Sequence, residues 1–387
     1  MSKALLVKIE PAILKYARKY SGLTTEQVSK KAKIALEKLE AYEEHGGDVP
    51  LTHLEKFSRI YKRPLAFFLL SKIPTDAVEP KEFRIVYKSK VVSFSPAAYL
   101  AIRRARYVQS VINELGENKF EYKFPTISTK DDTDKLATWF RNYLGVSFEK
   151  QRKWPNIQAA FREWKAALES KNIYVLQQSV PKDHVSAFSL VDKHPYVLLL
   201  NSTEHESRRI FSLFHEIGHV LLHKSGICSP EDLSRNSHAY VQIEKFCNQF
   251  AASFLVPKDQ FVNNADISRL AGIPVDEWDD NDLKIIAGQY KVSKEVVFRR
   301  FLTLGMISEE SYDKRRQQWL KEAKNFKQPK KKEFKIPMYR KCLSQNGKKF
   351  TSFILDQYHA NKITFSSAAD MLSINPKHMP RLEANIS

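Results

Sequence analysis

The chain has 387 residues, of which 43% are apolar and 28% charged, and its formal net charge is +19. The length favours two or three domains, and the balance of apolar and charged residues excludes a largely disordered chain. The three cysteines are too few for a disulfide framework, and the longest apolar runs, such as Leu65–Leu70, are too short to span a membrane. The first residues do not form a secretory signal, so we expect a cytoplasmic protein.

The positive charge is concentrated in two parts of the chain. Residues 1–75 contain 14 basic and 8 acidic side chains, and residues 313–349 contain 14 basic and three acidic ones. Within the second part, three consecutive lysines are candidates for contact with a nucleic acid or an acidic partner. They are Lys330, Lys331 and Lys332. The same composition is typical of a solvated, extended linker, which we predict over residues 313–346.

The first 74 residues predict a domain of five short helices. Pro11 begins the first helix, the third covers Ala35–Glu44, and Pro50 and Pro64 begin the last two. A tight turn joins the second helix to the third, as in a helix-turn-helix domain. The stretch from LTTEQVSKKAKI through YEEHGGDVPLTHLEKFSRIYKRPLAFFLL resembles the Xre/Cro-like helix-turn-helix family.

This resemblance implies DNA binding and, because operators are two-fold symmetric, a homodimer. The third helix nevertheless contains four Glu and one Lys, whereas a helix that lies against phosphates usually needs positive charge. A protein-docking or dimerising role for the domain therefore stays open.

The rest of the chain predicts a mostly helical α+β protein. A connector over residues 75–118 includes a long helix at Pro96–Leu115, and a central domain occupies residues 119–312. In that domain, the runs Ile173–Gln178, SAFSLVD and HPYVLLLN are rich in β-branched and aromatic residues and predict a small antiparallel sheet. Helical patterns precede these runs at residues 131–144 and 156–171.

Directly after the predicted sheet, the sequence RRIFSLFHEIGHVLLHK contains an HExxH motif. Residues four apart lie on one face of a helix, so His215 and His219 can bind one metal ion together. Glu216 lies beside this pair, where its carboxylate can act on a water molecule. Two imidazoles and a carboxylate suit zinc, although ligand type alone leaves manganese and iron open.

Catalytic zinc usually has three protein ligands, and Glu244 in IEKFCNQFAASFLVP is the best third candidate. This segment predicts a helix that ends at Pro257, with Glu244 and Asn248 on one face. The small side chains of Gly218 and Ala251 would let it lie close to the first helix. Competing candidates for the third ligand are His223, Asp232 and His238.

The run from SAFSLVDKHPYVLLLN to IEKFCNQFAASFLVP resembles the ImmA/IrrE-type metallopeptidase family, which often carries an N-terminal Xre-like domain. The resemblance covers about residues 10–320, and it implies His215, His219 and Glu244 as zinc ligands with Glu216 as general base. Phe214 and Cys247 depart from the family's usual pattern without removing a ligand.

Family members similar to this chain are cytoplasmic proteases that cleave a helix-turn-helix repressor and so relieve repression. The alternative function is a non-catalytic antitoxin or transcriptional regulator, which would neutralise a PIN-type nuclease toxin.

Cleavage of an amide also needs a donor for the oxyanion that develops. His238 and Tyr240, between the two metal-binding helices, are candidates for this role, whereas His205 fits a helix start at the surface. Residues 347–387 predict three short helices, which fit a partner-docking element or a second DNA-reading module.

Overall fold

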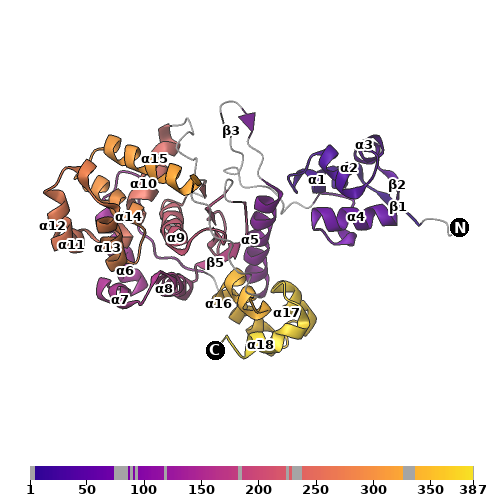
Figure 1. Ribbon diagram of the computed structural model, residues 1–387. Helices are drawn as coiled ribbons and strands as arrows, with labels where there is room; N and C mark the ends of the chain where they lie inside the picture. The colour runs from indigo at the N-terminus through magenta and orange to yellow at the C-terminus, as the bar shows by residue number, and fades with distance from the viewer. Residues whose placement is uncertain are drawn as a thin grey trace. The chain divides into compact units, whose positions relative to one another are not determined.

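The computed structural model describes residues 5–73, 86–87, 90–91, 95–116, 120–181, 185–223, 226–228, 238–325 and 336–386. Contacts along the chain divide it into two compact units, residues 1–104 and residues 105–387 (Figure 1). In the part of the chain described here, no helix has both the length and the apolar character of a membrane span.

Unit 1 contains the five predicted helical segments. They are α1 (Pro11–Lys19), α2 (Thr25–Ala32), α3 (Leu36–Glu44), α4 (Leu51–Tyr61) and the 3₁₀ helix η1 (Leu65–Leu69). Each begins within two residues of the expected position. Their apolar faces form one core, in which Leu14, Val28 and Leu39 are fully buried. One of the four glutamates of α3 does not face solvent. Glu43 is buried and accepts hydrogen bonds of 2.7 and 2.8 Å from Arg18.

Unit 1 also contains two strands that the sequence did not indicate. Strand β1 (Leu6–Ile9) pairs antiparallel with β2 (Gly47–Pro50), so that Val7 lies opposite Val49. Each strand has four residues, and β2 includes Gly and Pro, which are rare in strands. A pattern this short carries no strand signal.

The chain continues through two short strands, β3 (Val86–Tyr87) and β4 (Lys90–Val91), to helix α5 (Pro96–Leu115). Helix α5 has the predicted bounds. Unit 2, which begins within α5 at residue 105, continues with α6 (Thr133–Leu144), α7 (Phe148–Lys153) and α8 (Ile157–Ser170). The first and third of these confirm the helical patterns, whereas the six-residue α7 was not predicted.

The sheet of unit 2 is mixed, and the prediction of a wholly antiparallel sheet is wrong. Its strands are β5 (Tyr174–Gln178), β6 (Ala187–Leu190), β7 (Val197–Asn201) and β8 (Gly226–Cys228), in the order β5-β7-β6-β8. β6 and β7 form an antiparallel hairpin. On its other side β7 pairs with β5, and these two strands run parallel. Because β5 and β7 are buried along nearly their whole length, their residue pattern gave no sign of direction.

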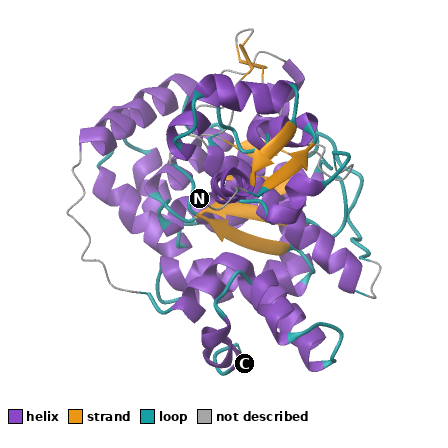
Figure 2. Ribbon diagram, turned by 90° about the vertical axis from the view of Figure 1, so that its right-hand side faces the viewer, coloured by secondary structure: helices purple, strands orange, loops and turns teal. Residues whose placement is uncertain are grey.

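Helices enclose this sheet (Figure 2). Helix α9 (Glu206–Leu221) packs on β6 and β7, and helix α10 (His238–Leu255) packs along α9. The C-terminal two thirds of α9 is buried on every side, from Ser212 to Leu221. The HExxH motif therefore lies inside the unit, between the sheet and α10.

The remaining elements of the central part follow α10 in the chain. They are α11 (Lys258–Val262), α12 (Ala265–Ala271), η5 (Val275–Glu277), α13 (Asp280–Tyr290) and α14 (Lys294–Thr303). Among them, α14 packs on α10 and α13 packs on α14.

The predicted linker over residues 313–346 is not extended where the structure describes it. Helix α15 (Glu309–Asn325) covers its first part. Tyr312 and Trp319 are seven residues apart, so they share one face of this helix. Tyr312 stacks on Phe298 with ring centroids 5.7 Å apart, and Trp319 meets the same ring edge to face at 5.4 Å. The many charged residues of this segment made the aromatic face of α15 hard to recognise in the sequence. Residues 326–335, including Lys330, Lys331 and Lys332, lie outside the described residues.

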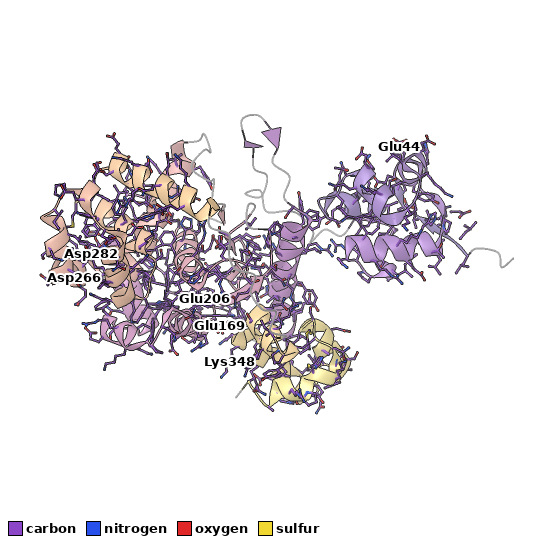
Figure 3. All side chains as sticks on the ribbon, in the orientation of Figure 1. Glu44, Glu169, Glu206, Asp266, Asp282 and Lys348 are labelled. Carbon is purple, nitrogen blue, oxygen red and sulfur yellow. The ribbon has the colours of Figure 1, made fainter. Side chains whose placement is uncertain are left out.

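The C-terminal helices are part of unit 2. They are α16 (Met338–His359), α17 (Phe365–Met371), η6 (Pro376–His378) and α18 (Met379–Glu383). Gly347 interrupts α16 with φ +79°, a conformation that favours glycine. Behind this break, the buried carboxylate of Glu169 accepts a hydrogen bond of 3.2 Å from the backbone N–H of Lys349. This contact ties α16 to α8, and α16 also packs along β5, the edge strand of the sheet. Glu169 and the neighbouring Lys348 are labelled in Figure 3.

Candidate metal centre

Helix α9 brings the two histidines of the HExxH motif together. Glu206 marks its first turn in Figure 3, and His215 and His219 follow one turn apart near its C-terminal end. Their Nε2 atoms are 3.2 Å apart, and both side chains are almost fully buried. Two imidazole nitrogens therefore face the same point.

Helix α10 contributes Glu244 to this point. Its carboxylate oxygens lie 3.2 Å from His215 Nε2 and 3.3 Å from His219 Nε2. An ion bound tetrahedrally at zinc's usual distances of about 2.0 Å would hold its donors about 3.3 Å apart. The two imidazole nitrogens and the nearer oxygen of Glu244 to each of them thus already lie close to the spacing that a tetrahedral zinc site requires.

The charges around this point favour a cation. Burial would raise the pKa of Glu244, but hydrogen bonds from His215 and His219 outweigh it and hold that pKa well below its ordinary value. Burial would likewise lower the pKa of His219, yet the neighbouring Cys247, Glu244 and Glu216 raise it well above the ordinary value. The pocket stabilises positive charge at the position where the donor atoms converge.

Cys247 adds a possible fourth donor that the sequence did not point to. His215, His219 and Cys247 offer ligand atoms that all lie within 4.8 Å of one another, and this buried group could hold a metal ion. Burial raises the pKa of the Cys247 thiol, which favours the protonated form over the thiolate that binds metals. The shorter distances to Glu244 therefore favour the carboxylate as the third ligand.

The carboxylate of Glu216 lies on the sheet side of α9 and is fully buried. Its Oε2 accepts a hydrogen bond of 2.6 Å from Ser189 Oγ on β6. Its Oε1 has no hydrogen-bond partner among the described residues. A buried carboxylate oxygen without a partner is costly, and it is available to accept a proton.

Asn248 orients the first histidine. Its Oδ1 lies 3.1 Å from His215 Nδ1, and with Oδ1 as the acceptor His215 carries its proton on Nδ1. A metal ion that displaces the proton shared between Nε2 and Glu244 would then find on Nε2 the lone pair that it needs. The sequence placed Asn248 on the same face as Glu244, but its partner could only be found in the structure.

Residues 168–302 match the family model of the IrrE N-terminal-like domain, a peptidase family. The matched residues run from the end of α8 to α14, so they include the sheet, the HExxH helix and Glu244. The match supports the ImmA/IrrE resemblance and a metallopeptidase-type function. It does not extend to unit 1, whose helix-turn-helix assignment stays a prediction. A comparison with curated proteins gives no match.

Within the IrrE-like region, Gly218 lets α9 and α10 approach closely. A Cβ atom at Gly218 would lie 3.0 Å from Cys247 Cα and 3.0 Å from its Sγ. Backbone atoms cannot give way as a flexible side chain can. The small residue at 218 therefore sets the distance between His219 on one helix and Glu244 on the other.

Gly218→Ala is expected to push the two helices apart, because the added methyl group meets the backbone of Cys247. Overpacking of this kind costs about 1–3 kcal/mol, so we expect a free energy of unfolding lower by that amount and weaker zinc binding. The matched control is Gly288→Ala in α13, where an added Cβ meets nothing within 4 Å. That control should gain about 0.5–1 kcal/mol from helix propensity. Denaturant unfolding and zinc titration measure both effects, and equal behaviour of the two variants would contradict the packing argument.

The other predicted site residues fall into three groups. Tyr240 lies on α10 one turn before Glu244, on the same helical face. His223 contacts the hydroxyl of Tyr196 through Nδ1 at 3.3 Å, whereas His205 is an exposed N-cap of α9, as expected. The side chains of Asp232 and His238 lie outside the described residues.

Proposed function

We propose that this protein is a zinc-dependent endopeptidase that cleaves a helix-turn-helix transcriptional repressor. One observation carries the catalytic part of the proposal. Three buried side chains bring their nearest donor atoms within 3.2–3.3 Å of one another, and the first of them, His215, is followed in the chain by a buried carboxylate with a free oxygen. A structural metal site has no use for that carboxylate. The IrrE-like match supports the same class of reaction.

His215, His219 and Glu244 would hold the zinc ion. A zinc ion bound there would polarise the scissile carbonyl and lower the pKa of a water molecule. Glu216 would accept a proton from the attacking water through Oε1 and then pass it to the leaving nitrogen. Tyr240, one turn from Glu244, is our candidate donor to the developing oxyanion.

The choice of a repressor as substrate rests on the resemblance to ImmA/IrrE-type proteins. Unit 1 would then contribute recognition, of DNA or of the repressor itself. The outer surface of α3 carries the exposed Glu37, Glu40 and Glu44 beside a single lysine, Lys38. This charge suits a basic protein surface better than phosphates.

The test is to incubate the zinc-loaded full chain with purified helix-turn-helix repressors encoded beside its own gene. We expect one of them to be cut at a single position, which mass spectrometry of the fragments would identify. Removal of zinc with a chelator should abolish the cut, and added zinc should restore it. Cleavage that persists without metal, or no cleavage of any neighbouring repressor, would contradict the proposal.

A further inference from the structure

Strand β6 carries one polar side chain on the face that α9 covers. Ala187 and Ser189 point to this face, because alternate residues of a strand share one side. The residue opposite Ser189 on β7 is Leu198, which belongs to the hydrophobic core. Ser189 itself is completely buried. A hydroxyl in such a place costs stability unless it has a hydrogen-bond partner.

The partner is the carboxylate of Glu216, also completely buried, at 2.6 Å. The hydroxyl can donate to this oxygen, and a carboxylate that receives such a bond keeps a fixed orientation. Because the Ser189 hydroxyl holds Oε2, the carboxylate group of Glu216 is not free to rotate. Oε1 is left without a partner among the described groups.

We propose that Ser189 is a positioning residue, which holds Glu216 so that Oε1 is presented to the attacking water. The proposal rests on the proposed peptidase function and adds to it a residue from the sheet. A side chain of Glu has three rotatable bonds, so a buried Glu without a tether would spend part of its time in unproductive orientations. Strand β6 is paired on both sides, with β7 and β8, and is therefore a rigid support for the tether.

The fold explains why this arrangement needs both elements. Helix α9 fixes only the Cα and Cβ of Glu216, and its neighbours His215 and His219 are occupied with each other and with Glu244. The only polar group that the described part of β6 offers on this face is the hydroxyl of Ser189. An apolar residue there would fit the core equally well and would leave Oε2 without its donor.

The experiment compares three variants of the zinc-loaded full chain. Ser189→Ala should lower kcat about 10- to 100-fold, the range expected for losing a hydrogen bond to a charged group, with KM and bound zinc unchanged. Ser189→Thr keeps the hydroxyl and should recover most of kcat. Ser253→Ala is the matched control, because Ser253 is an equally buried serine that bonds Arg300 at 2.8 Å. It should lower the melting temperature and leave kcat unchanged.

A second measurement does not need turnover. A peptide hydroxamate binds zinc and also hydrogen-bonds to the neighbouring carboxylate, so its affinity reports on Glu216. Calorimetry should show that Ser189→Ala weakens hydroxamate binding in the wild-type background and has no effect in the Glu216→Gln background. An equal loss in both backgrounds, or wild-type kcat in Ser189→Ala, would overturn the positioning role. If the wild-type chain cleaves nothing, the peptidase function fails, and the hydroxamate comparison still decides on Ser189.

Discussion

Glu216→Gln is expected to retain zinc and to lose cleavage by about 10²- to 10⁴-fold, the usual contribution of a general base. Glutamine has the size and hydrogen-bonding capacity to keep the contact with Ser189, but its amide cannot accept the proton of the attacking water. The three proposed metal ligands are untouched. Cleavage rates at saturating substrate, with the zinc content of the same preparation, measure the effect.

The matched control for this substitution is Glu206→Gln in the first turn of the same helix. Glu206 pairs with Arg209 at 2.6 Å, far along α9 from the motif. We expect near-normal cleavage from this control. Should Glu216→Gln cleave as well as the control, the carboxylate would have no role in proton transfer. Should it also leave the cellular phenotype unchanged, the alternative of a non-catalytic antitoxin or regulator would be favoured.

Substitution of Glu244 is the second change with a large expected effect. Glu244→Gln removes the negative charge and replaces a strong oxygen donor with a weak one. Even residues that only support a ligand contribute 10- to 100-fold to metal affinity, so we expect zinc affinity to fall by at least about 100-fold. Competition with a chelator of known affinity measures this directly, and it needs no knowledge of the substrate.

The same titration decides between the two possible ligand sets. If Glu244 is the third ligand, Cys247→Ala should bind zinc within a few-fold of the wild type and lose only packing. Cys342→Ala in α16 is the control, because it removes another buried thiol at a distance from the site. A large loss of zinc in Cys247→Ala, with little loss in Glu244→Gln, would mean that the His-His-Cys group binds the metal.

The motif itself was readable from the sequence because its geometry is local. His215 and His219 are four residues apart, and any α-helix places them on one face. The choice of Glu244 needed a second step, namely that two helices with small residues would pack closely. The structure places its carboxylate beside both histidines, and it places Gly218 directly against Cys247.

Other features depended on partners that the sequence does not name. Ser189 looked like one residue of an ordinary strand, because its importance lies in the contact with Glu216, 27 residues away. The basic stretch after residue 313 looked like a linker, because charge is visible in composition but the aromatic contacts of Tyr312 and Trp319 with Phe298 are not.

The sequence by itself determined the helices of unit 1, the helices α5, α6, α8 and α9, the HExxH face and the chemistry that two imidazoles and a carboxylate can support. These follow from periodicity and residue type, which act over a few residues. Only the tertiary structure decided the direction of β5, the course of α15 and α16, and the groups that hold Glu216 and His215. Such features arise from packing and hydrogen bonds between segments far apart in the chain, and one sequence contains no record of which segments meet.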